Sequence, residues 1–163
     1  MSVLILVILA VSGGLATTLI ASDRRAAFAV GLATSVAVLI AALSISGGDT
    51  VSLADSIVGG SDGLRIVAVA WASSALLFGS IDALLGNGPA VVGPSLIGFG
   101  LGVLGLSVAD AGIGFALLSA GGLATAVMPV AVARSGSEPA AALGARFLRP
   151  LLAAALLSLV AVA

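Results

Sequence analysis

The sequence lacks four residue types that carry much of protein chemistry, namely cysteine, histidine, lysine and tyrosine. Disulfides, zinc sites of the Cys/His type, iron–sulfur clusters and haem ligation through imidazole all need side chains from this set. A Schiff-base lysine is excluded for the same reason. We therefore expect no cofactor, and proton transfer would fall to the seven carboxylates, to hydroxyl groups and to water.

Charge is also scarce, because charged residues make up 8% of the 163 positions, whereas an ordinary soluble domain has roughly a quarter. Hydrophobic residues make up 61% of the chain, and the mean hydropathy is +1.35. A water-soluble fold could not cover its surface with so few polar side chains, and no basic patch suggests nucleic acid. The composition predicts an integral membrane protein surrounded by the lipid bilayer.

Apolar runs near the roughly 20 residues that a membrane-spanning helix needs fill most of the chain. They cover residues 2–21, 26–46, 65–85, 90–109, 111–133 and 147–163. The runs predict one all-α membrane domain over residues 1–163, a polytopic bundle of about six transmembrane helices. The longest polar stretch, residues 47–64, contains two Gly pairs, which predict an exposed loop with room for a short interfacial helix.

Arginine lies mainly on one side of this predicted bundle. The first, third and fifth connections hold Arg24, Arg25, Arg134, Arg146 and Arg149, and the other side holds only Arg65. Cytoplasmic loops retain positive charge, so we expect both termini to be external and the protein to lie in the plasma membrane. A signal peptide is the alternative for the first run, but its basic residues follow the apolar stretch instead of preceding it.

Asp82 is the only carboxylate well inside an apolar run, where an ionisable group is costly unless it is paired or hydrated. It is a candidate for a proton or cation relay, although a charge solvated at the helix end near the interface is the favoured interpretation. Ser73, Ser74 and Ser119 are candidates for a polar lining of the same path. Bonding of each hydroxyl to a carbonyl of its own helix is the commoner alternative.

Glycines recur at small-xxx-small spacings, which let helix backbones approach closely in lipid. The candidates for helix packing are Gly98, Gly102 and Gly105 in the fourth run and Gly121 and Gly122 in the fifth, and Gly13 and Gly14 fit the same account. The string GGLAT occurs at residues 13–17 and 121–125, and GLAT recurs at 31–34. In a chain so rich in Gly, Ala and Leu, chance is favoured over an internal repeat.

The acidic stretch between the second and third runs does not predict a metal site. Asp49, Asp55 and Asp62 lack the dense oxygen-ligand pattern of a calcium loop. General acid–base catalysis usually needs His or closely paired carboxylates in a pocket. We therefore expect a solvated external surface here, and no enzyme.

The polar segments between the apolar runs follow a definite order along the chain. The basic turn ASDRRAA is followed by the longer Asp-rich stretch, and Asp110 opens the fifth run. After that run come Arg134, Ser135, Glu138, Ala140, Ala141, Ala142, Leu143 and Phe147, leading into LLAAALLSLV. This layout resembles the first six helices of the antiporter-like membrane subunits of complex I, Mrp-type cation/proton antiporters and membrane-bound hydrogenases.

Departures from that family limit what the resemblance implies. Ser119 stands on or near the place of the family's proton-handling glutamate, and Ala145 and Arg146 replace a lysine. The family also continues through further helices with essential lysines. The resemblance therefore implies a split or truncated relative, an accessory or structural subunit of a proton- or cation-translocating respiratory or antiporter complex, associated with larger antiporter-like subunits. The alternative is a small self-contained oligomeric transporter or channel for protons or cations, and the sequence does not identify the ion.

Overall fold

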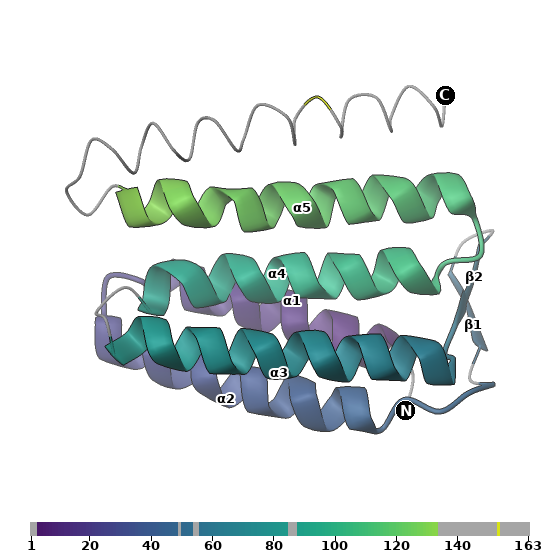
Figure 1. Cartoon of the computed structure of the whole chain (residues 1–163), viewed down its shortest axis with the longest axis horizontal. Coiled ribbons are helices and arrows are strands. Elements are labelled where there is room, and N and C mark those ends of the chain that lie inside the picture. Colours follow the sequence, from purple (N-terminus) through teal and green to yellow (C-terminus); the bar gives the residue numbers. More distant parts are fainter. Residues whose placement is uncertain (1–2, 49, 54–55, 85–87, 134–152, 154–163) are drawn as a thin grey trace.

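The computed structural model describes residues 3–48, 50–53, 56–84, 88–133 and 153. The described part of the chain contains five helices (Figure 1): α1 (Val3–Leu19), α2 (Arg24–Leu43), α3 (Asp62–Leu84), α4 (Gly88–Ser107) and α5 (Ala111–Ala133). The prediction of a mostly helical chain is confirmed by these helices, which match the first five apolar runs. The sixth run, residues 147–163, lies outside the described residues except for Ala153.

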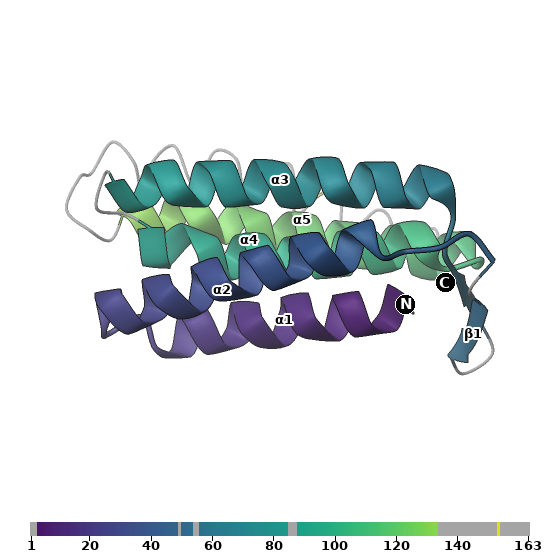
Figure 2. The same ribbon diagram turned by 90° about the horizontal axis from the view of Figure 1, so that it is seen from below.

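The helices lie side by side with alternating direction, so successive connections fall at opposite ends of the bundle (Figures 1 and 2). Helix α4 is central and contacts α1, α2, α3 and α5, whereas α5 contacts α4 alone among the described elements. Because α4 is enclosed, its side chains Leu96, Phe99 and Val103 are almost completely buried. The core of the bundle is therefore built around a helix that comes late in the chain.

Length and composition single out α2 as the one described helix that is long and apolar enough to cross a membrane. Other apolar helical stretches in the described residues, Val3–Leu19, Val91–Ser107 and Ala111–Thr125, are shorter than 18 residues. The structure thus shows the helical architecture, and its described part does not by itself support six membrane crossings.

The segment between α2 and α3 differs from the prediction. It forms an antiparallel hairpin of β1 (Thr50–Leu53) and β2 (Ser56–Gly59), so the expected loop with a short helix was wrong and the fold is not purely α. The hairpin sequence is rich in β-branched residues, which favour extended backbone. The flanking Gly pairs break a helix, but they do not select between a loop and a strand.

Side-chain caps fix where three helices begin. The Asp23 carboxylate accepts hydrogen bonds from the backbone N–H groups of Arg25 and Ala26, at 3.0 and 3.2 Å. The Ser61 hydroxyl accepts one from the Leu64 N–H at 3.0 Å. These bonds satisfy backbone donors that have no partner within the first turn of a helix.

Asp110 caps α5 in the same way, because its Oδ1 accepts a hydrogen bond from the Ile113 N–H at 2.9 Å. We expect Asp110→Ala to lower the free energy of unfolding by about 1 kcal/mol, the usual cost of losing an N-cap. Asp110→Asn keeps an acceptor oxygen and should lower the free energy of unfolding much less. Denaturant unfolding in mixed micelles measures both variants, and equal losses would contradict the capping role.

Candidate functional site

The most distinctive feature of the described structure is the set of glycines on α4, which point towards three neighbouring helices. Gly93 and Gly100 meet α1, Gly98 and Gly105 meet α5, and Gly102 lies against the ring of Trp71 on α3. In a membrane, small residues at helix contacts allow backbone-to-backbone packing. Helix α4 therefore receives close neighbours on several faces at once.

The contact between α4 and α5 consists of reciprocal glycine pairs. A Cβ atom added to Gly105 would lie 2.8 Å from the Gly114 carbonyl oxygen, and one added to Gly114 would lie 2.7 Å from the Gly105 oxygen. Gly98 and Gly121 face one another in the same manner, with 2.9 Å in both directions. Each pair is two helical turns from the other on both helices, so one antiparallel register generates both contacts.

The contact between α1 and α4 repeats this arrangement. A Cβ atom on Gly14 would lie 2.7 Å from the Gly93 oxygen, and the reverse distance is 2.9 Å. Two turns further along, a Cβ atom on Gly100 would lie 3.3 Å from the Val7 oxygen. Helix α4 is therefore held on two sides by backbone contacts that leave no room for a larger side chain.

The contact between α1 and α2 pairs glycine with threonine instead. The Thr34 side chain occupies the space beside Gly13, and a Cβ atom on Gly31 would lie 3.2 Å from Thr17 Cγ2. The Thr17 hydroxyl donates to the Gly13 carbonyl and the Thr34 hydroxyl to the Val30 carbonyl, both at 2.8 Å. The hydroxyls are thus satisfied within their own helices, and the rest of each threonine fills the gap at a glycine.

These contacts give the recurring Gly-Leu-Ala-Thr strings a physical meaning. The copies at residues 13–17 and 31–34 face each other across α1 and α2, and the third contributes Gly121 and Thr125 to the contact with Gly98. Glycine and threonine three or four positions apart share one helix face. The strings can be seen in the sequence, but nothing in it indicates which helices they join.

We expect Thr17 to serve packing more than polarity, because its side chain is fully buried and its hydroxyl is bonded to its own helix. Thr17→Val keeps the branched shape and should change the free energy of unfolding by less than about 0.5 kcal/mol, whereas Thr17→Ser removes a buried methyl group and should cost about 1 kcal/mol. Unfolding in mixed micelles compares the two. A larger loss for valine than for serine would indicate that the hydroxyl has a role beyond its helix.

The structure does not bring the candidate polar-lining residues together. Ser73 and Ser74 are exposed on α3, and the Ser74 hydroxyl donates to the Ala70 carbonyl at 2.8 Å. Ser119 is half-buried on α5, a helix that α3 does not contact. Asp82 belongs to α3, but its side chain lies outside the described residues.

Polar groups buried inside the described bundle are satisfied locally. The Ser35 hydroxyl donates to the Gly31 carbonyl and the Ser107 hydroxyl to the Leu104 carbonyl, each at 2.8 Å. In the described part of the chain, every buried side-chain oxygen or nitrogen has a hydrogen-bond partner. The same residues contain no group of three or more acidic, His or Cys side chains that could hold a metal ion.

Four of the five glycines predicted to pack helices lie at these contacts, and the fifth, Gly122, takes part in a hydrogen bond within α5. Gly98, Gly105 and Gly121 lie in the reciprocal pairs, Gly102 lies against Trp71, and Gly122 contributes the carbonyl that accepts the Thr125 hydroxyl at 2.8 Å. Trp71 also packs edge-on against Phe99, with ring centroids 5.6 Å apart and planes at 84°. The described site is therefore a packing interface centred on α4.

No family model matches the sequence, and no curated protein and no solved structure matches it either.

Proposed function

We propose that this chain is a multi-pass plasma-membrane protein of about six transmembrane helices that serves as an accessory or structural subunit of a proton- or cation-translocating complex. The observation that carries the proposal is the combination of glycine-mediated backbone packing inside the bundle with aliphatic side chains outside it. This combination suits helices that associate in lipid, where van der Waals packing replaces the hydrophobic effect as the driving force.

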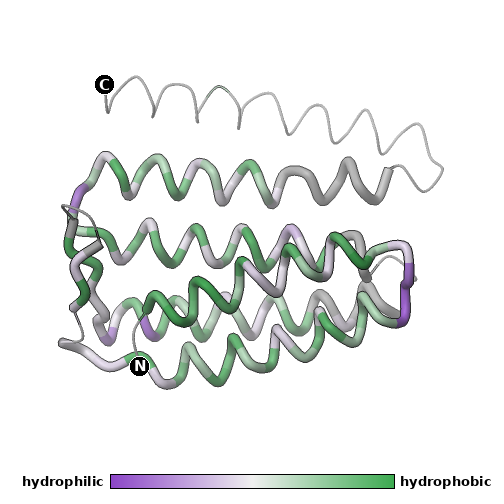
Figure 3. The backbone as a smooth tube through the Cα atoms, turned by 180° about the vertical axis from the view of Figure 1, so that it is seen from behind, coloured by the Kyte–Doolittle hydropathy of each residue, from purple (hydrophilic) through white to green (hydrophobic). Residues whose placement is uncertain are grey.

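The outer faces of the helices support a bilayer as the surroundings. Ile8, Ile40, Ile66 and Leu77 are 60–68% exposed although they are large and apolar. They belong to three helices, and Figure 3 shows hydrophobic residues continuing along each helix. Monomeric soluble proteins rarely expose apolar patches of more than a few hundred Å², whereas such a surface is favourable against lipid.

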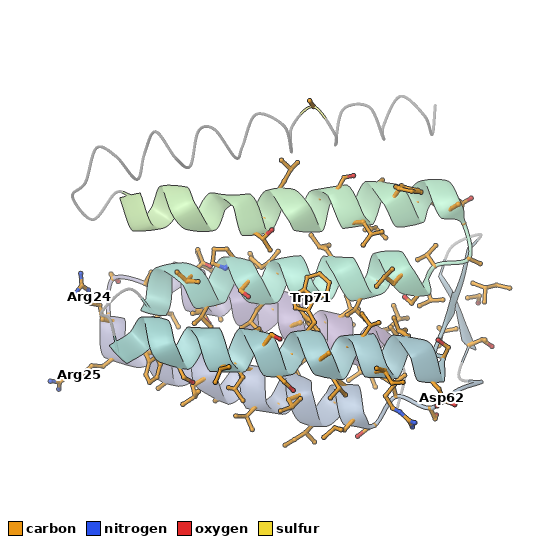
Figure 4. The ribbon with its side chains drawn as sticks, viewed as in Figure 1. Arg24, Arg25, Asp62 and Trp71 are labelled. Carbon is orange, nitrogen blue, oxygen red and sulfur yellow. The ribbon has the colours of Figure 1, made fainter. Side chains whose placement is uncertain are left out.

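Charges gather at the two ends of the bundle. Arg24 and Arg25 lie at one end, and Asp62 lies at the other (Figure 4), where it pairs with Arg65 at 3.2 Å. The hydrophilic colours in Figure 3 fall at the same two ends. Under the positive-inside rule, the arginine pair marks the cytoplasmic end and the hairpin marks the external end.

The helix lengths are compatible with this orientation. Helices of 17–23 residues span about 25–35 Å at the usual rise of an α-helix, and the hydrocarbon core of a bilayer is about 30 Å thick. Small differences in length are absorbed by tilt and local changes in bilayer thickness. Crossing by all the helices is thus physically reasonable, although α2 is the one helix in the described part of the chain that is long and apolar enough by composition to cross a membrane.

The interior favours a structural role over ion transfer. A proton or cation path needs ionisable or hydrated groups that face one another, whereas the hydroxyls of Thr17, Ser35 and Ser107 are all engaged by their own helices. The resemblance to antiporter-like subunits supplies the class of assembly, and the absence of lysine from the sequence fits a member without the family's own ion-transfer residues.

Copurification tests the proposal directly. The tagged chain, extracted from native membranes in a mild detergent, should bring larger antiporter-like subunits with it, whereas recovery of the chain alone would contradict the proposed role. Reconstituted by itself into sealed vesicles, the chain should carry no proton or cation flux. Flux that Asp82→Asn reduces would favour the self-contained transporter instead.

A further inference from the structure

The turn between α1 and α2, residues 20–23, has a backbone that is fixed by hydrogen bonds. The N–H groups of Ile20 and Asp23 donate to carbonyls of preceding residues at 3.0 and 2.9 Å. The Asp23 carboxylate then caps α2, whose first two residues are Arg24 and Arg25. Both arginines are therefore held at defined positions on one end of the bundle.

The two arginine side chains carry their charges outward from this turn. Both are exposed, and Figure 4 shows them extending away from the ribbon. Neither forms an ion pair with another residue in the described part of the chain, whereas Arg65 at the opposite end is paired with Asp62. Asp23 is already bonded to the first N–H groups of α2. The guanidinium groups of Arg24 and Arg25 are therefore the groups that remain available to a ligand.

Large apolar side chains lie close to these charges. Leu19, the last residue of α1, is 82% exposed, and Ile20 is 38% exposed. In a bilayer, aliphatic side chains of this kind lie among the acyl chains, while arginine reaches the headgroup level. A free anion would leave Leu19 and Ile20 exposed to water, which is unfavourable. A phospholipid therefore suits both parts of this surface.

We propose that Arg24 and Arg25 bind the headgroup phosphate of an anionic phospholipid. The acyl chains of that lipid lie against Leu19 and Ile20, and each planar guanidinium group can donate two parallel hydrogen bonds to phosphate oxygens. Two arginines and one aspartate give the turn a net charge of +1, which favours a lipid of net negative charge over a zwitterionic one. The inference rests on the proposed function for the membrane location and for the cytoplasmic side of this end.

Native mass spectrometry of the full chain, in detergent micelles with phosphatidylglycerol or phosphatidylcholine, measures the affinity for each lipid. Arg24→Gln and Arg25→Gln should each weaken phosphatidylglycerol binding about fivefold, and both together about thirtyfold, as expected for arginines near an anionic membrane surface. Binding of phosphatidylcholine should change little. The matched control is Arg65→Gln, which removes an arginine that is already paired with Asp62 and should leave both affinities unchanged.

A lysine variant separates the guanidinium group from its charge. Arg24→Lys with Arg25→Lys keeps the positive charge that orients the helices but cannot bind phosphate through two parallel hydrogen bonds. Its affinity for phosphatidylglycerol should fall between those of the unaltered chain and the double Gln variant. Equal affinities of the unaltered chain for the two lipids, or an unchanged phosphatidylglycerol affinity in the double Gln variant, would overturn the proposal. Displacement of the lipid by inorganic phosphate at equal concentration would also overturn it, because the site would then be one for a free anion.

Copurification of the double Gln variant distinguishes a lipid from a protein ligand. The variant should still bring the larger subunits with it, as the unaltered chain does. Loss of those subunits with an unchanged phosphatidylglycerol affinity would place Arg24 and Arg25 in a protein interface and overturn the assignment to a lipid. Failure of lipid binding leaves copurification of the unaltered chain unaffected, so the two proposals are tested by separate measurements.

Discussion

Val36→Lys should strongly oppose the insertion of α2 into a membrane. Val36 is 42% exposed on the outer face and lies within a turn of the middle of this helix. A lysine near the centre of a membrane-spanning helix costs about 2.5–3.5 kcal/mol, which corresponds to a shift of about 100-fold in the insertion equilibrium. Glycosylation mapping in microsomes, with acceptor sites on either side of α2, measures the fraction of chains that span.

The matched control is Ile20→Lys, in the turn that leads to Arg24 and Arg25. Ile20 is similarly exposed, at 38%, but a lysine there lies beside other basic residues at the end of the bundle and should leave insertion unchanged. If these positions faced water instead, both substitutions would change the free energy of unfolding by less than about 0.5 kcal/mol, as surface substitutions usually do. If Val36→Lys behaved like its control, α2 would not be in contact with lipid.

Gly105→Ala should separate α4 from α5 and lower the free energy of unfolding by about 1–3 kcal/mol, the usual cost of overpacking. The new Cβ atom would meet the Gly114 oxygen at 2.8 Å and the Leu118 nitrogen at 3.1 Å, and both are backbone atoms. Rotation of a side chain cannot relieve these contacts, so the helices have to move apart. Denaturant titration in mixed micelles provides the measurement.

Two further variants test the origin of that loss. Gly63→Ala, in the first turn of α3, places its Cβ atom 3.9 Å from Ser61 Oγ, an ordinary van der Waals contact, and should be neutral or slightly stabilising. The double variant Gly105→Ala with Gly114→Ala should cost less than the two single losses together, because one displacement relieves both contacts. Strict additivity would show that the two glycines do not share a contact.

The sequence predicted the helices well because apolar runs and the turn residues between them mark helix boundaries directly. The predicted fifth run, residues 111–133, coincides with α5 (Ala111–Ala133), and the predicted first run, residues 2–21, contains α1 (Val3–Leu19). The hairpin was missed because its four-residue strands are too short for a period-two pattern to stand out. Asp110 was noticed as an acidic residue, but its role as a cap depends on the local turn geometry.

The pairing of helices could not be read from the sequence. Small-residue spacing marked one face of α4, yet its glycines meet α1, α3 and α5, and the choice of neighbour depends on how all five helices fit together. Gly31 begins the string at residues 31–34 and Gly93 lies in the glycine-rich fourth run, but neither position indicates the helix that the glycine meets. The packing of threonine against glycine could not be predicted for a similar reason, because a Gly–Thr contact depends on the register between two helices.

The central position of α4 has a consequence for the synthesis of the protein. Its contact with α1 joins Gly14 to Gly93, residues far apart in the chain, and such non-local contacts form slowly. When the first three helices have left the ribosome, the face of α1 that contains Gly14 does not yet have α4 as its neighbour. The nascent chain therefore exposes the Gly14 face of α1 until α4 has been synthesised.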